Sequence, residues 1–300
     1  DRQEHVITAK EADYYNLKGH FEEFVSKAMF STAGIRSFID ILHSENPEKM
    51  YNDMFMALLI ETEGEFLRDV HKEIKAKLEQ KGDLKVFAEH IKGEMGEETV
   101  AVIEDIYGMK LETILSFLKE NIVKLVGGEV RVHTAKFCEM ESRILAGQGI
   151  TVITPEHYTD SVPIYMYSFL TYILGAAGAT HYTSSHSANY LYGRKNLAPD
   201  GAQLLPDLYK KYIEILDRII NKEIYGAEGR HKVVMAPADD EHILNVLTYE
   251  QMVKLFISIL NTTQEDVKTI NKAAEHGQKI VLNCLNGSTW PDALALTTWR

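Results

Sequence analysis

Residues 111–128 read LETILSFLKENIVKLVGG and carry the clearest periodic signal in the chain. Their apolar positions recur at spacings of three and four, which is the period of an amphipathic α-helix. These positions are Leu111, Ile114, Leu115, Leu118, Ile122 and Leu125. Gly127 and Gly128 follow, and glycine readily takes the left-handed conformation in which many helices end. The stretch therefore predicts a helix over 111–126 with Gly127 just beyond its end.

The same helical period appears in other parts of the chain. We predict further helices over 47–80, 206–226, 248–260 and 263–275. Strand-like runs are short: 129–133, 149–153, 231–235 and 279–282. They are too scattered to suggest a series of β-α-β units, so the sequence predicts a mainly α, multi-helix protein with a few short strands.

A glycine-rich joint lies near the middle of the chain, at Gly147-Gln148-Gly149. It separates a half rich in Lys and Glu from a half rich in Tyr, His and Ser. We therefore expect two helical lobes, residues 1–147 and 148–300, with a single domain as the alternative.

Overall charge and hydropathy exclude some classes of protein. The 300 residues hold 32 Lys and Arg against 44 Asp and Glu, a formal charge of −12, which disfavours capture of nucleic acid or anionic membranes by net charge. The longest apolar stretch, 162–179, is interrupted by a proline and two glycines, so no membrane span is expected. Cys138 and Cys284 form no CxxC pair, which favours a soluble protein in a reducing compartment.

Segment 156–194 has the most unusual composition, with seven of the 15 tyrosines and three of the 12 histidines. Both side chains combine an apolar body with a polar tip, which suits a protein interface or a ligand pocket. We expect this segment to contribute to the contact of a homo-oligomer. The candidate interface residues are Tyr165, Tyr167, Tyr172, Tyr190 and Tyr192.

The same segment holds the candidates for an enzyme site. The catalytic candidates are His157, Asp160, His181, His186 and Arg194, and the metal-ligating candidates are the three histidines His157, His181 and His186. A metal site on one helix needs ligands that converge, and His181 and His186 are five residues apart, which separates them around a helix. The sequence therefore names no cofactor.

Motifs for other chemistry are weak or absent. There is no GxSxG elbow, P-loop or GxGxxG, and Ser184-Ser185-His186 places Ser beside His only in sequence, so covalent catalysis is not favoured. Glu61, Glu65 and Asp69 form a carboxylate ladder, but interleaved basic residues make a solvated helix face the better interpretation.

Three functions stay open at this point. The leading prediction is a non-catalytic protein that works by protein–protein contacts, as a self-assembling or scaffold component. One alternative is a metal-dependent enzyme with its pocket between the two lobes. The other is an all-α nucleoprotein that binds single-stranded RNA in a local basic cleft, because basic residues cluster in 68–85 and at 194–195 and 210–211.

Overall fold

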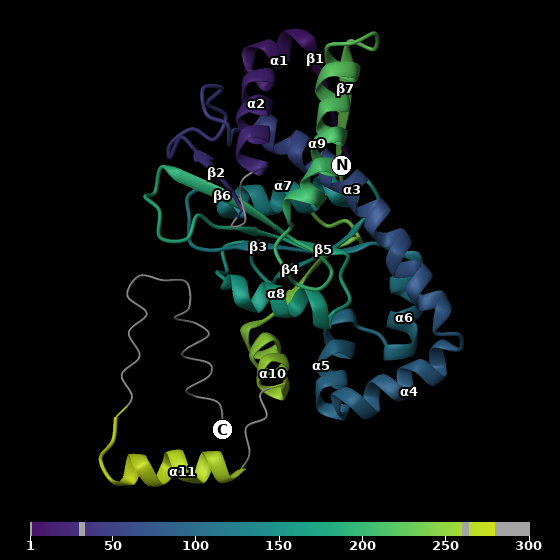
Figure 1. The fold of residues 1–300 in the computed structure, drawn as a ribbon, viewed down its shortest axis with the longest axis vertical. Coiled ribbons are helices and arrows are strands. Elements are labelled where there is room, and N and C mark those ends of the chain that lie inside the picture. The colour runs from purple at the N-terminus through teal and green to yellow at the C-terminus, as the bar shows by residue number, and fades with distance from the viewer. Residues whose placement is uncertain (1, 30–33, 260–263, 280–300) are drawn as a thin grey trace.

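The computed structural model describes residues 2–29, 34–259 and 264–279 (Figure 1). The helices in this part of the chain are α1 (Ala9–Tyr14), α2 (Leu17–Ala28), α3 (Asp53–Gln80), α4 (Leu84–Met95), α5 (Glu97–Tyr107), α6 (Leu111–Glu120), α7 (Thr134–Gly147), α8 (Ile164–Ile173), α9 (Pro206–Asp217), the π-helix η1 (Arg218–Ile224), α10 (Tyr249–Ile259) and α11 (Gln264–Glu275). The strands are β1 (Gln3–Thr8), β2 (Ile35–Phe38), β3 (Val123–Gly128), β4 (Thr151–Pro155), β5 (Gly178–Tyr182), β6 (Leu191–Leu197), β7 (Arg230–Met235) and β8 (Ile243–Leu247).

Six of these strands form one mixed sheet in the order β2-β6-β5-β3-β4-β8. Strands β5, β3, β4 and β8 run parallel, β6 is antiparallel to β5, and β2 is antiparallel to β6. Strand β2 therefore points the same way as β5, and both end at the same edge of the sheet. The remaining pair, β1 and β7, forms a separate antiparallel ribbon.

Helices cover both faces of the six-stranded sheet. Helices α3 and α7 pack on one face, and α8 with α10 covers the other (Figure 1). The prediction of a mainly α protein is therefore wrong: the centre of the chain is a three-layer α/β arrangement. The predicted division at 147/148 stays a prediction, although β3 and β4 lie next to each other in this sheet from either side of it.

The stretch 111–128 shows why the periodicity misled. Helix α6 ends at Glu120, Asn121 is extended, and the chain continues as β3. All six residues of β3 are buried because the strand has neighbours on both sides and helices on both faces. A strand of this kind is apolar at nearly every position, so Ile122 and Leu125 also fitted the helical spacing.

The two glycines after that stretch are in β3 and have no left-handed conformation, so the predicted helix end at Gly127 is wrong. These two glycines allow neighbouring parts of the chain to approach β3 closely. A Cβ on Gly127 would lie 2.0 Å from the Oη of Tyr167, and one on Gly128 would lie 2.8 Å from the carbonyl oxygen of Tyr182. Glycine is required here because α8 and the neighbouring strand leave no room for a side chain.

Other predicted helices are confirmed with changed bounds. The 47–80 helix begins at Asp53, where Asn52 Oδ1 accepts a hydrogen bond from the Phe55 amide at 2.9 Å. Thr248 and Gln251 form a reciprocal capping pair at the start of α10. The 206–226 segment divides into α9 and η1, and 263–275 is α11.

Two of the four predicted strands are confirmed, with changed bounds. Strands β4 and β7 occupy most of the runs 149–153 and 231–235. Run 129–133 is a loop after β3. Run 279–282 lies, apart from its first residue, outside the described residues.

In the described part of the chain, no helix combines the length and the apolar character needed to cross a membrane.

Candidate functional site

The candidate site lies at the carboxyl edge of the sheet, where β2, β3 and β5 end. In open α/β sheets, ligands bind beyond the carboxyl ends of the strands, at the point where successive connections leave in opposite directions. Here β3 leads through α7 to β4 on one side, whereas β5 leads through a loop, residues 183–190, to β6 on the other. We call this loop the crest loop.

Ser185 lies in the crest loop with an unusual backbone. Its φ is +56°, a left-handed value that few residues other than glycine adopt, and one that tends to occur at functional sites. Three contacts hold it there. Its amide donates to Thr183 Oγ1 at 2.9 Å, its carbonyl oxygen accepts from Arg131 Nη2 at 2.6 Å, and its Oγ accepts from Arg36 Nη2 at 3.2 Å. The hydroxyl is half-buried and fixed beside a guanidinium group.

Arg131 fastens the crest loop to β3. Besides Ser185, its guanidinium donates to the carbonyl oxygens of Ser187 at 3.0 Å and of Ala188 and Leu191 at 3.3 Å. Its Nε pairs with Glu129 Oε1 at 2.6 Å. Because its donors are used in these bonds, Arg131 shapes the loop and leaves ligand binding to other cations.

Two other cations reach the same place and are poorly neutralised. Lys195 is only 7% exposed, yet within the part of the chain that the structure describes it makes no hydrogen bond or ion pair. Burial, and then the positive charge of Arg36, lowers the pKa of Lys195. Arg36 has a buried Nε without a hydrogen-bond partner among the described residues. A buried donor without a partner and two positive charges close together are both unfavourable, and a bound anion would relieve both.

Two glycines make room for these cations. An added Cβ on Gly34 would lie 2.5 Å from Lys195 Cγ, and one on Gly193 would lie 3.3 Å from Arg36 Cγ. Lys195 therefore packs against Gly34, and Arg36 lies close to Gly193, whose Cβ position is also closed by the Thr183 carbonyl oxygen. Arg36 and Lys195, with Ser185 Oγ 3.2 Å from Arg36 Nη2, are therefore a candidate site for an anion, which we call the anion pocket.

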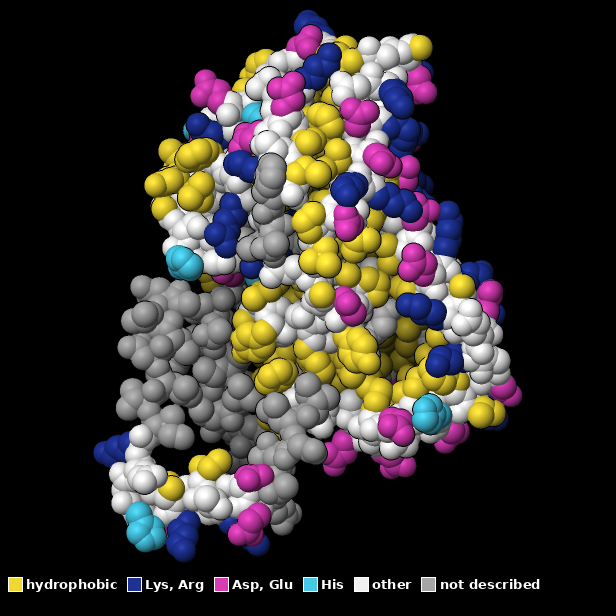
Figure 2. Space-filling model, in the orientation of Figure 1, with side chains coloured by type: hydrophobic (Ala, Val, Ile, Leu, Met, Phe, Trp, Pro, Cys, Tyr) yellow, Lys and Arg dark blue, Asp and Glu magenta, His cyan; other side chains and the backbone are white. Residues whose placement is uncertain are grey.

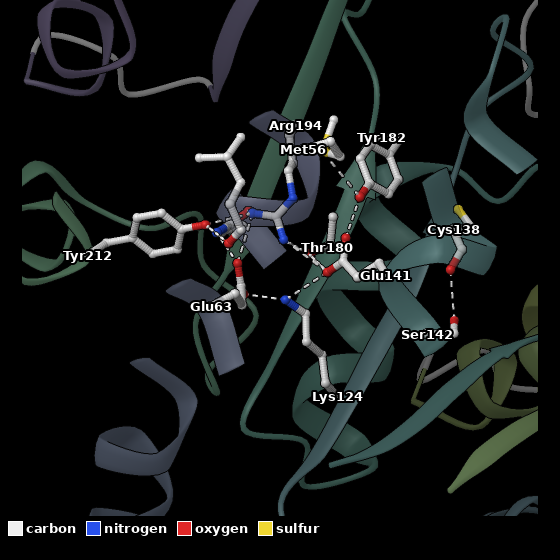
Figure 3. A network of polar contacts seen from close by, with 12 residues as sticks. Met56, Glu63, Lys124, Cys138, Glu141, Ser142, Thr180, Tyr182, Arg194 and Tyr212 are labelled. Atoms are coloured by element: carbon white, nitrogen blue, oxygen red, sulfur yellow. Dashed lines mark hydrogen bonds and ion pairs between the residues drawn. The ribbon is translucent and has the colours of Figure 1, made fainter. Parts of the chain in front are cut away.

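A second polar cluster lies on the other face of the sheet and is fully buried (Figure 3). Glu63 of α3 and Glu141 of α7 face two cations, Lys124 of β3 and Arg194 of β6. Arg194 donates to Glu63 Oε2 at 2.8 Å and to Glu141 Oε1 at 2.9 Å, and Lys124 contacts both carboxylates. The four formal charges cancel, and the cluster ties β6 and β3 to both helices.

The catalytic candidates from the sequence are not brought together. Arg194 belongs to the buried cluster, whereas His181 points to the opposite face, where its Nε2 donates to the Val162 carbonyl oxygen at 2.6 Å. His157 is exposed after β4, and its amide donates to Asp160 at 3.1 Å. His186 is exposed in the crest loop beside Ser185.

The metal candidates show a similar separation. Among the described residues, no group of three or more His, Cys, Asp or Glu side chains is arranged to hold a metal ion. His157 and His186 are exposed, and His181 is 1% exposed beneath α8. Burial lowers the pKa of His181 to about 4.

The candidate interface tyrosines divide into two groups. Tyr167 and Tyr192 lie in the core with no exposed surface. Tyr165, Tyr172 and Tyr190 are 42%, 66% and 52% exposed, so these three are the ones that can meet a partner. The homo-oligomer stays a prediction.

Sequence reasoning did not name Arg36, and it did not assign Ser185 or Lys195 to a common site. The motif Ser184-Ser185-His186 was noticed, but the backbone conformation that distinguishes Ser185 has no sequence signature outside glycine. Lys195 stands beside Arg194 in the sequence, and only the alternation of strand β6 shows which cation faces the anion pocket. Arg36 comes from a strand about 150 residues away from Ser185.

Comparison with known proteins gives one family match. The profile of the phosphoglucomutase/phosphomannomutase alpha/beta/alpha domain I matches residues 84–223, slightly less than half of the chain. The matched range contains Arg131, Ser185 and Lys195, but not Arg36. A search of curated proteins found no match.

One similar solved structure is a crystal structure of a protein described as a "putative phosphomannomutase" from Thermus thermophilus. It is 19% identical, the TM-score is 0.32, and the match covers 53% of this chain. The chain spans 31% of the length of that structure.

These findings correct the leading functional prediction. The matched domain belongs to phosphohexomutases, which are enzymes, so the interpretation of the chain as a non-catalytic scaffold is wrong. The alternative of an enzyme is better supported. In the described residues the candidate site lies at a sheet edge, whereas the sequence had suggested a pocket between two helical lobes.

Proposed function

We propose that this chain contains the phosphoryl-carrying domain of a phosphohexomutase-type enzyme, and that Ser185 is the residue that carries the phosphoryl group. The observation that supports this most is the hydrogen bond from Arg36 Nη2 to the hydroxyl of Ser185, with Lys195 close enough to Arg36 for the two positive charges to affect each other. Ser185 and Lys195 lie in the range that matches domain I, and Arg36 lies before it. A phosphate ester has the charge and size that two unneutralised cations favour.

The chemistry of such a transfer is simple to balance. The Oγ of Ser185 attacks the phosphorus atom of a hexose phosphate, the bond from phosphorus to the sugar oxygen breaks, and the serine proton ends on that sugar hydroxyl. In the return step a different hydroxyl of the sugar attacks the phosphoserine, which restores the serine. The transition state spreads charge over the phosphoryl oxygens, so positioned cations accelerate both steps.

The structure suggests how the residues divide this work. Arg36 binds both the nucleophile and the incoming anion, because its Nη2 already donates to Ser185 Oγ. Lys195 supplies a second positive charge, held in place by its largely buried side chain. Arg131 holds the crest loop in place, so that the nucleophile needs no rearrangement before attack.

The test is covalent labelling. The chain is incubated with glucose 1,6-bisphosphate and magnesium chloride, and the phosphorylated residue is identified by mass spectrometry of peptides. We expect one phosphoryl group on Ser185. Ser185→Ala should abolish the label, and Ser184→Ala is the matched control, because the Ser184 hydroxyl is buried and donates to the Leu191 carbonyl oxygen at 2.8 Å.

Two further variants test the cations. Arg36→Met and Lys195→Met keep most of the side-chain volume and remove the charge, so we expect each to slow labelling by about 100-fold or more. A label on another residue, or full labelling of Ser185→Ala, would contradict the proposal.

A further inference from the structure

A pair of exposed aromatic rings stands at the end of the anion pocket. Phe38 of β2 and Tyr190 of the crest loop stack with 6.2 Å between ring centroids and 14° between ring planes. Phe38 is 54% exposed and Tyr190 is 52% exposed. Figure 2 shows hydrophobic side chains gathered at the edge of the molecule beside β2 and β6, to the upper left. We call Phe38 and Tyr190 the ring pair.

Strand register places the ring pair next to the candidate nucleophile. Side chains two residues apart on a strand lie on the same face, so Phe38 follows Arg36 on the face that carries the anion pocket. Across the strands, Arg36 is paired with Gly193, and the Thr183 amide donates to the Gly193 carbonyl oxygen. Phe38 is therefore about 7 Å along β2 from Arg36. The end of β5 is in the row of Ile35, so it is about 10 Å along and about 10 Å across the strands from Phe38.

Both sides of the ring pair are fixed by hydrogen bonds. The Ile39 amide donates to the Tyr190 carbonyl oxygen at 3.0 Å, which joins the two loops. Asp40 accepts from the amides of Leu42 and His43, at 2.9 and 3.1 Å, and so closes a turn after β2. A surface that is rigid before binding loses little entropy when a ligand arrives.

These distances suit a hexose phosphate. With the phosphoryl group between Arg36 and Ser185, a sugar ring extends toward the ring pair over about the distance that the register sets. The faces of a pyranose carry C–H groups, which pack on aromatic rings, while its hydroxyls stay in water. The crest loop, which contains Tyr190, also has two exposed polar side chains, His186 and Asn189, that offer hydrogen bonds to such hydroxyls.

We propose that the ring pair, Phe38 and Tyr190, binds the sugar ring of the phosphorylated hexose and so selects hexose phosphates over smaller phosphate esters. This inference rests on the proposed function, because it assigns the phosphoryl end of the ligand to the anion pocket. The inference gives Phe38 and Tyr190 a role in substrate binding. Phe38 lies outside the range that matches domain I.

The experiment measures binding of two probes to the whole chain by calorimetry or by NMR titration. The probes are glucose 6-phosphate, which has the sugar, and inorganic phosphate, which lacks it. We expect the variant Phe38→Ala/Tyr190→Ala to weaken glucose 6-phosphate about tenfold and to change inorganic phosphate by less than about twofold. Tyr172→Ala is the matched control, because Tyr172 is similarly exposed but lies at the far end of α8.

Each other outcome overturns the inference. Equal weakening of both probes would mean that the rings only support the crest loop. Unchanged binding of both, or wild-type chain that binds the two probes equally well, would mean that the rings do not touch the sugar. A wild-type dimer that becomes a monomer in the double variant, with unchanged binding of glucose 6-phosphate, would identify the rings as a contact between copies.

The labelling of Ser185 separates this inference from the proposed function. If Ser185 is labelled while the double variant binds glucose 6-phosphate normally, the function stands and the ring pair has no role in it. If Ser185 is never labelled but glucose 6-phosphate binding depends on the rings, the nucleophile is wrong and the sugar site stands. Failure of the wild-type chain to bind either probe overturns both.

Discussion

Neutralising Glu141 should strongly destabilise the protein. Glu141→Gln keeps the shape of the side chain and an acceptor for Thr180 Oγ1, which donates to Glu141 Oε1 at 2.6 Å. The change removes one of two negative charges from a cluster whose two cations, Lys124 and Arg194, stay in place without access to water. An uncompensated buried charge of this kind costs about 3–5 kcal/mol.

The dependence of stability on pH gives a second test of what the Glu141 charge contributes to folding. Burial alone raises the pKa of Glu141, but the charges of Arg194 and Lys124 outweigh it and lower the pKa to about 2, from an ordinary 4.5. A carboxyl whose pKa is depressed by folding contributes stability that is fully present above pH 4.5 and is lost as the pH falls toward 2. The direction of this shift agrees with a stabilising role for the Glu141 charge.

Urea unfolding of four proteins tests this reasoning: the wild type, Glu141→Gln, Lys124→Met, and the double variant. The double variant leaves Glu63 and Arg194 as a balanced pair with 2.8 Å between their atoms, so its loss of stability should be smaller than the sum of the two single losses, by about 1–3 kcal/mol. The reasoning is refuted if Glu141→Gln costs less than about 1 kcal/mol at pH 7, or if the two single losses add.

Three further predictions follow from single contacts. Gly127→Ala should lower the free energy of unfolding by about 1–3 kcal/mol, and with it the melting temperature, because the new Cβ meets the buried hydroxyl of Tyr167. A rise in the melting temperature would contradict this packing. Burial raises the pKa of Glu61 to about 7, so Glu61→Gln should stabilise the protein more at pH 8 than at pH 5, where the wild-type carboxyl is protonated; thermal unfolding at the two pH values decides. Burial lowers the pKa of His181 to about 4, so the wild type should lose stability as the pH falls from 6.5 toward 4, and the imidazole resonances of His181 in NMR should not titrate above pH 5; a midpoint near 6.5 would mean that the ring is exposed.

The sequence predicted most of the long helices because their apolar stripes and end signals are local. Thr248 and Gln251, for example, form a cap from four consecutive residues. The sheet was missed for a physical reason: buried parallel strands such as β3 lack alternation, and their pairing partners lie far away in sequence. Strand β2 shows the same problem, because its four residues pair only with β6, more than 150 residues later.

The candidate site was harder to predict than the fold. It depends on a left-handed serine and on two cations that become neighbours only after β2, β6 and β5 align. Composition drew attention to segment 156–194, and this segment does contain Ser185. However, the residue type that made it conspicuous, tyrosine, was distributed between the core and the surface, and the serine that we assign to the chemistry is one of the commonest residues in the loop.

Strand β6 gives Arg194 and Lys195 opposite roles, although the two are adjacent and similar in charge. Alternation along the strand sends Arg194 to the face of α3 and α7, where two carboxylates, a threonine and an asparagine accept hydrogen bonds from its Nη atoms. The same alternation sends Lys195 to the other face, where it is nearly as buried but makes no hydrogen bond or ion pair with the described residues. Since stability alone would favour a partner for both, Lys195 is the cation that we expect a ligand to neutralise. Exchanging the residue types would test this asymmetry: Lys195→Met should retain or raise stability while weakening phosphate binding, whereas Arg194→Met should unfold the protein.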